Sequence, residues 1–215
     1  MVIATEDLLT LVQWMSPSFP IGAFAYSNGL ETDIENGRVN SLSTLADWIE
    51  TSVRFGSGHS DALFLAAAYH ADLSDIVDID ARNRAFGASR ERRMESDLQG
   101  AAFCQTVHKI WGLPLEALSY PVAVGAAAQL RGLPLIDTSA LFLQAYVGNL
   151  AAVAMRLVPL GQTEGQQVIA QSISLCRETA HDTAHGDLEQ LSSTTFLADI
   201  ASMQHETLHS RIFRT

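Results

Sequence analysis

The stretch T-S-A-L-F-L-Q-A-Y-V-G-N-L-A-A-V-A-M-R-L, residues 138–157, is the most apolar part of this 215-residue chain. Its length would suit a membrane span, but polar residues and a glycine interrupt it, namely Gln144, Gly148, Asn149 and Arg156. A membrane-crossing helix needs about 20 residues that are mostly apolar and carry few or no charges. The stretch therefore predicts a buried helix instead of a membrane span.

Helical periodicity extends over most of the chain on both sides of this stretch. Apolar residues recur with a period of about 3.6 in 43–55, 75–86, 89–111, 121–131 and 163–184. The six prolines all fall between these periodic segments, and no run of four or more residues alternates as a strand would. We therefore predict an all-α fold, a single-domain bundle of about eight to ten helices with a C-terminal amphipathic tail.

The composition limits the partners and the compartment. Twenty-four acidic against thirteen basic residues give a net charge of −11, which argues against nucleic acid or an anionic membrane as the main partner. Cys104 and Cys176 have no C-x-x-C spacing and lie in apolar patterns, so we expect reduced core cysteines. Glu6 and Asp7 stand where a secretory signal would be basic. These features favour a cytoplasmic protein.

The last residues differ from the rest of the chain. After a helical core over 1–184, residues 185–194 are polar and unpatterned and predict a linker. Residues 195–215 then regain apolar side chains: Phe196, Leu197, Ile200, Met203, Leu208, Ile212 and Phe213. Two interpretations stay open, a last helix folded on its own core or an arm that is loosely packed until it binds a partner.

Two short patterns resemble catalytic motifs. H-E-T-L-H, residues 205–209, fits the H-E-x-x-H signature of zinc hydrolases, but the six residues after it contain no third ligand. A-Y-S-N-G, residues 25–29, half resembles the nucleophile elbow of serine hydrolases, but it lacks the first glycine and the preceding strand. We interpret the second pattern as a tight turn into a helix, with Gly22 and Gly29 permitting close backbone approach.

Other candidates for chemistry are equally incomplete. His181 and His185 have the spacing of a ligand pair, although a solvated helix end explains them as well. The basic group is either a surface helix with intrahelical pairs or a surface for an acidic partner: Arg82, Arg84, Arg90, Arg92 and Arg93. No phosphate-binding glycine motif is present. The residues alone thus favour an interaction protein over an enzyme, with no cofactor, no catalytic residue and no metal ligand assigned.

Three ordered blocks are far more specific than these patterns. S-P-S-F-P-I-G-A-F-A-Y-S-N-G-L-E at 16–31, N-L-A-A-V-A-M-R-L-V-P-L-G-Q-T-E-G-Q at 149–166 and the tail at 200–215 resemble blocks of the UreF family of urease accessory proteins. Weaker matches lie between them at 93–100 and 121–125. The resemblance spans nearly the whole chain.

The resemblance implies which residues serve as structural and interface positions. They are Pro20, Gly22, Tyr26, Ser27, Gly29, Glu31, Arg156, Pro159, Gly161, Gln162, Gly165, Asp199, His205, Glu206, Arg211, Phe213 and Arg214. The family usually has an aromatic residue at the position of His209, so the second histidine of H-E-T-L-H is a coincidence. Thr215 stands where the family has serine, and the proline often found before Asp199 is missing.

The resemblance also implies a function. A member of this family is expected to be an all-α homodimer without enzymatic activity that acts as a chaperone in nickel insertion into apo-urease. It would bridge the accessory protein UreD/UreH and the GTPase UreG and modulate GTP-dependent metal delivery. The alternative is a nickel-binding metallochaperone that uses the pairs His181/His185 and His205/His209.

Overall fold

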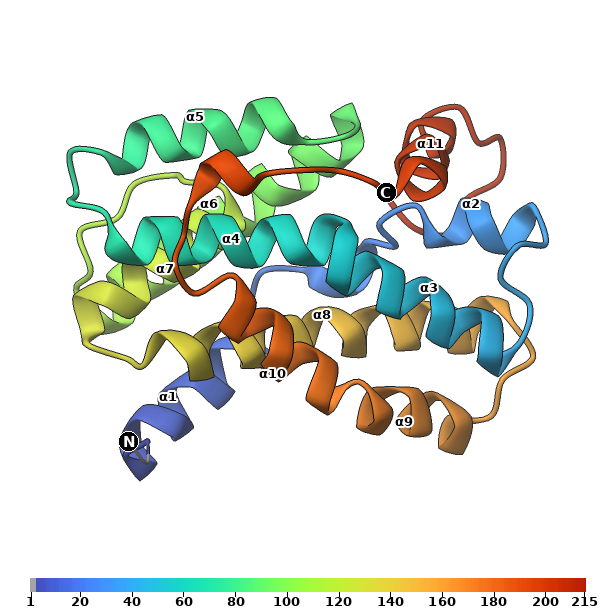
Figure 1. Ribbon diagram of the computed structural model, residues 1–215, viewed down its shortest axis with the longest axis horizontal. Coiled ribbons are helices and arrows are strands. Elements are labelled where there is room, and N and C mark those ends of the chain that lie inside the picture. The colour runs from blue at the N-terminus through green and yellow to red at the C-terminus, as the bar shows by residue number, and fades with distance from the viewer. Residues whose placement is uncertain (1–2) are drawn as a thin grey trace.

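Helices form the regular structure of residues 3–215, which are the residues that this computed structural model describes (Figure 1). The α-helices are α1 (Thr5–Trp14), α2 (Leu30–Glu35), α3 (Leu42–Phe55), α4 (Ser57–His70), α5 (Ile76–Phe86), α6 (Arg90–Trp111), α7 (Tyr120–Arg131), α8 (Leu135–Leu157), α9 (Gln162–Gln171), α10 (Ile173–Asp182) and α11 (Phe196–His205). Two short 3₁₀ turns are η1 (Ala23–Ala25) and η2 (Leu188–Gln190). These residues include no strand, and the all-α prediction is confirmed.

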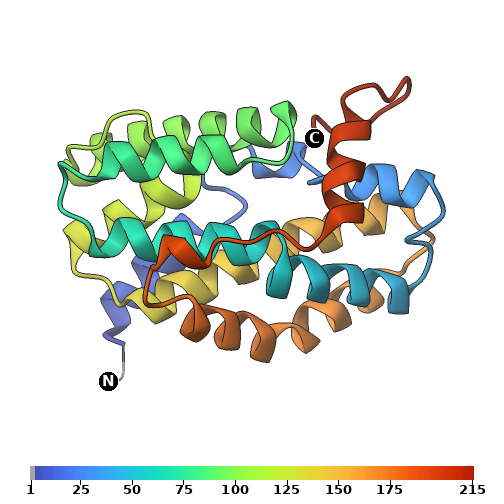
Figure 2. The same ribbon diagram turned by 45° about the horizontal axis from the view of Figure 1, so that its top comes forward.

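The helices are arranged around α4, which crosses the middle of the molecule (Figure 1). It packs on α3, α7 and α8, while α5 lies on one side and α9 and α10 lie on the other (Figure 2). The apolar helix α8 is, within residues 3–215, the one helix whose length and composition would also suit a membrane. It contacts α2, α4, α9 and α10, so it is the core helix that its sequence predicted.

Aromatic side chains fill the core between α1, α6 and α7. The ring of Trp14 lies edge-on to Phe103 and Trp111, at centroid distances of 5.3 Å and 5.8 Å. Phe103 also meets Tyr120 at 5.9 Å. Edge-to-face pairs of this kind are favourable beyond the apolar area that they bury. Cys104 and Cys176 are buried and unpaired, as predicted for core cysteines.

The N-terminal half of α6 departs from the predicted pattern. The apolar periodicity of 89–111 would bury Met94 and Leu98, but these side chains are exposed. The buried face is polar instead and consists of Glu91, Glu95 and Gln99. The prediction is wrong here because the partners of these carboxylates come from the far end of the chain, as described below.

The predicted helix over 163–184 is divided at Ser172. Its hydroxyl donates to the carbonyl of Val168 at 2.9 Å, a bond that bends helices, and α10 starts at the next residue. The polar segment 185–194 then crosses α4 and runs between α4 and α5 (Figure 1). It buries Leu188, and Arg82 donates to the Leu188 carbonyl at 3.2 Å. The segment is therefore fastened to the bundle at its middle.

Candidate functional site

The first family-like block and the last residues of the chain meet in one place. The backbone N–H of Arg214 donates to the carbonyl of Ala25 at 2.8 Å, and that of Ser27 donates to the carbonyl of Thr215 at 2.9 Å. The Ser27 hydroxyl donates to the same Thr215 carbonyl. Asn149 of α8 donates to the Tyr26 carbonyl at 2.9 Å. Residues from all three family-like blocks thus converge on the C-terminal segment, residues 195–215.

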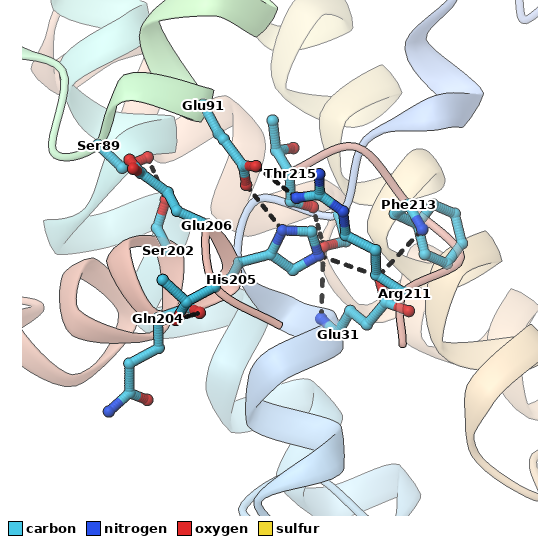
Figure 3. A network of polar contacts seen from close by, with 12 residues as sticks. Glu31, Ser89, Glu91, Ser202, Gln204, His205, Glu206, Arg211, Phe213 and Thr215 are labelled. Atoms are coloured by element: carbon cyan, nitrogen blue, oxygen red, sulfur yellow. Dashed lines mark hydrogen bonds and ion pairs between the residues drawn. The ribbon is translucent and has the colours of Figure 1, made fainter. Parts of the chain in front are cut away.

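His205 lies at the centre of this region and is fully buried. Figure 3 shows its ring between two carboxylates, one from α2 and one from α6. Nδ1 lies 2.8 Å from Oε2 of Glu91, and Nε2 lies 3.0 Å from Oε2 of Glu31. The last residue of α11 therefore joins three helices that are distant in sequence.

The same two carboxylates also hold the residues that follow α11. Glu31 accepts the backbone N–H groups of Ile212 at 2.7 Å and Phe213 at 3.0 Å. Glu91 accepts the guanidinium of Arg211 at 2.5 Å. Hydrogen bonds to charged groups are about twice as strong as neutral ones, so these contacts fix the path of the chain after α11. We call the set His205, Arg211, Glu31 and Glu91 the tail anchor.

A second buried cluster lies one turn further along α6. Glu95 accepts the hydroxyl of Thr215 at 3.1 Å and the amide of Asn28 at 3.2 Å. Arg92 is bonded to Asp61 and lies 3.5 Å from Glu95. Burial raises the pKa of both Asp61 and Glu95, and Arg92 counteracts part of that rise. This cluster explains why the α6 face is polar.

Gly29 and Gly22 have different roles. Gly29 has a φ of 82°, and a Cβ there would lie 2.8 Å from the backbone nitrogen of Ser202 in α11. Gly22 has a φ of 72°, but nothing lies within 4 Å of its Cβ position. The predicted close backbone approach is confirmed at Gly29 and wrong at Gly22, which is needed for its left-handed conformation alone.

Besides Asn149, the central block contributes to this region one of the residues that the resemblance assigned. The guanidinium of Arg156 lies 5.9 Å from the ring centroid of the buried Phe213, a cation–π distance. The other four residues of the block lie at the turn from α8 into α9 and do not reach the tail anchor: Pro159, Gly161, Gln162 and Gly165. The structure thus separates the assigned residues of the central block into one contact residue and a structural turn.

The remaining predicted residues lie around the tail anchor. Tyr26 is buried, and Glu206 accepts the backbone N–H of Arg90 at 2.8 Å. Asp199 is bonded to Ser193 at the start of α11. Two residues are exposed and make no side-chain bond to the tail anchor: Pro20 and Arg214.

The structure corrects the interpretation of the basic group as residues of a surface helix that pair mainly within that helix. Arg92, predicted to lie on a surface helix, is buried against Asp61. Arg82, Arg84 and Arg90 pair with acidic groups of other segments: Glu189, Asp97 and Glu206. Two intrahelical pairs are also present in the group, Arg84 with Asp80 and Arg92 with Glu95. Sequence reasoning missed the buried, paired roles of Glu91, Arg92 and Glu95, and of these three only Glu95 lies in the weak family-like block at 93–100.

H-E-T-L-H does not form a pair of metal ligands. Both ring nitrogens of His205 face glutamates, whereas His209 is exposed after the end of α11. Residues 3–215 contain no group of three or more His, Cys, Asp or Glu side chains that could hold a metal ion.

The outer face of α11 is apolar and uncovered. Four of its side chains are between 45% and 70% exposed: Phe196, Leu197, Ile200 and Met203. Phe196 and Leu197 border a groove of about 430 Å³ against α3, where Trp48 also lines the wall. Of the two interpretations left open by the sequence, the loosely packed arm does not describe the inner side of the segment, where His205 and Phe213 are buried.

Comparison with known proteins gives a single family. Residues 39–173 match the family model described as UreF. The chain is 48% identical over 211 residues to the urease accessory protein UreF of Ruegeria pomeroyi, covering 98% of this chain and 97% of that protein. The corresponding protein of Roseobacter denitrificans is 47% identical over 214 residues, covering 100% and 96% of the two chains. That of Bradyrhizobium diazoefficiens is 41% identical, covering 97% and 91%. These matches confirm the resemblance of the three blocks, and the chain belongs to the UreF family of urease accessory proteins.

Proposed function

We propose that this protein is a non-catalytic chaperone of urease maturation in the cytoplasm. In this proposal it bridges the UreD/UreH accessory protein and the GTPase UreG, and it supports GTP-dependent insertion of nickel into apo-urease. The observation that supports it is the two-faced C-terminal segment, which is anchored inside by charged residues and apolar outside.

The outer face of α11 fits a docking role. Burying its exposed apolar area would contribute favourable free energy at about 25 cal/mol per Å². A helix already held in place has lost its conformational freedom before a partner arrives, so docking costs less ordering entropy. We propose that UreD/UreH binds this face, so that 195–215 is the partner-binding segment and 1–184 is the core that carries it.

The buried ionisable groups support a scaffold instead of an enzyme. Glu31, Glu91 and Glu95 are all used to hold the C-terminal segment. A catalytic carboxylate needs access to a substrate, and these carboxylates are covered by the chain itself. The nickel-binding alternative also loses one of its two histidine pairs, because His205 is held by glutamates.

Co-expression and co-purification with UreD/UreH and UreG test the proposal. The double variant Leu197→Ser/Ile200→Ser removes two outer-face side chains without touching the tail anchor. We expect an unchanged circular dichroism spectrum and melting temperature, with loss of UreD/UreH from the purified complex.

Ile173→Ser is the matched control, because Ile173 is 60% exposed on α10. It should retain the partner. Normal co-purification of the double variant would contradict the proposed docking face. Stoichiometric nickel binding by the isolated protein in equilibrium dialysis would instead favour the metallochaperone.

A further inference from the structure

We propose that His205 is held as an imidazolium, and that this buried cation positions the C-terminal segment so that the outer face of α11 is displayed. The first part concerns the isolated protein. The consequence for docking rests on the function proposed above.

The argument starts from the number of hydrogen-bond donors. A neutral imidazole has one N–H and one bare nitrogen, whereas a protonated ring donates from both nitrogens. Both nitrogens of His205 lie within 3.0 Å of a carboxylate oxygen. A neutral ring beside two carboxylates would place two acceptors against each other at one of these contacts. The geometry therefore requires an additional proton between the three groups.

The other donors place that proton on the ring. Glu31 already accepts two backbone N–H groups, and Glu91 already accepts the Arg211 guanidinium. Hydrogen bonds of this kind favour the ionised form of a carboxyl group. The two carboxylates then face two cations, His205 and Arg211, and the tail anchor is balanced in charge. A neutral ring would leave an uncompensated negative charge in a buried place, which is costly.

Among residues 3–215, the cations of the neighbouring elements are paired elsewhere and do not replace the ring. From α6, Arg92 is committed to Asp61 and Glu95, and Arg90 pairs with Glu206. From α2, Glu31 is the charged group that reaches the ring. The remaining cation of the tail anchor is Arg211, whose side chain is 41% exposed. His205 is thus the fully buried member that connects α2, α6 and α11.

Glu31 explains how a charge on the ring affects the position of the chain. One carboxylate holds both His205 and the backbone of Ile212 and Phe213. The end of α11 and the residues that return toward Ala25 therefore share one acceptor. Loss of the positive charge from the ring would weaken its hydrogen bond to Glu31, and both parts of the segment would loosen together.

Nitrogen-15 NMR of the full-length protein at pH 7.5 tests the charge state. We expect two ring N–H signals for His205, each with the nitrogen shift of a protonated imidazole nitrogen. Assignment uses His205→Gln, with His209→Gln as the matched control from the same motif. A spectrum with one protonated and one bare nitrogen on His205 would overturn the proposal, whatever happens with any partner.

Hydrogen exchange tests the positioning role. In Glu91→Gln a neutral amide can donate to Nδ1, so the ring should become neutral and keep only the Nε2–H that faces Glu31. The amide of Phe213 should then exchange about 10-fold faster or more, the effect of weakening a buried charged hydrogen bond. Glu206→Gln, beside the ring but without a contact to it, should leave the exchange unchanged. Equal acceleration in both variants, or in neither, would overturn the role.

The wild-type spectrum still decides the charge state if Glu91→Gln fails to fold. Co-purification separates this inference from the proposed function. If the ring is an imidazolium and Phe213 responds as expected, but Leu197→Ser/Ile200→Ser still binds UreD/UreH, the docking proposal fails and the charge assignment stands.

Discussion

At the scale of single residues, Glu95 links pH to stability. Burial raises its pKa above the ordinary value of 4.5, so the folded protein holds this proton more tightly than the unfolded chain does. Stability contributed by such a group is present at low pH and falls as the pH rises from about 4.5 through the folded pKa. Asp61 is shifted in the same direction and adds to the effect.

The substitution Glu95→Gln tests this linkage. The wild-type protein should lose stability relative to the variant between pH 5 and pH 8, because only the wild type must ionise a buried group. Urea denaturation at the two pH values measures the difference. Glu50→Gln, at an exposed carboxylate, should give a curve parallel to the wild type. Parallel curves for Glu95→Gln would show that Glu95 keeps an ordinary pKa.

The two glycines of the first block should respond differently to alanine. Gly22→Ala adds strain at a positive φ, with a cost of about 1–2 kcal/mol, and should leave complex formation intact. Gly29→Ala adds the same strain and a clash with the backbone of Ser202, and we expect about 2–5 kcal/mol in total. Thermal denaturation gives the order of the two costs. Equal melting temperatures would contradict the close approach of α11 to α2.

At the scale of helices, the sequence predicted which segments are helical but not which face of α6 is buried. Most helix positions follow from periodicity and from the prolines between them. Apolar periodicity assumes that carboxylates face water, and it fails where Glu91 is paired with His205, which is 114 residues away. The break at Ser172 was missed for a similar reason, since one side-chain hydrogen bond does not change the apolar pattern.

Ser89 tests the junction between two helices. Its hydroxyl caps α6 by accepting the N–H of Arg92 at 3.0 Å, and it also meets the Ser202 hydroxyl of α11 at 2.7 Å. Ser89→Ala should cost about 2 kcal/mol, from the lost cap and an unsatisfied Ser202. Ser41→Ala, at the half-exposed cap of α3, should cost about 1 kcal/mol. Equal losses in chemical denaturation would show that the contact to α11 contributes nothing.

At the scale of the whole molecule, the C-terminal segment should be separable from the core. Deleting 195–215 removes His205 and Arg211, but it also opens Glu31 and Glu91 to water, so no buried charge is left unpaired. We expect the helical circular dichroism of 1–194 to persist at a lower melting temperature, with complete loss of UreD/UreH binding. A truncated protein that is unfolded would mean that the segment belongs to the core.

The family resemblance implies a homodimer, and we predict that the first helix provides its contact. α1 exposes three apolar side chains: Leu8, Leu9 and Val12. In a two-fold symmetric dimer each interaction across the interface occurs twice. One substitution in the chain therefore disturbs the contact in two places. Leu9→Glu should convert a dimer to a monomer in light scattering after size-exclusion chromatography. Val77→Glu, at a 68% exposed position on α5, is the matched control and should not change the mass. An unchanged mass for Leu9→Glu would place the dimer contact elsewhere.

The hydrogen bonds between the first block and the last residues also determine when folding can be completed during synthesis. Ser27 and Thr215 are 188 positions apart, and Glu31 and His205 are 174 apart. During synthesis α2 and α6 leave the ribosome long before their partners, because chains emerge from the N-terminus. Closing so long a loop comes after the local helix contacts have formed. The helix α11 is therefore fixed in position last. A prematurely terminated polypeptide lacks the residues that hold it and does not present its outer face.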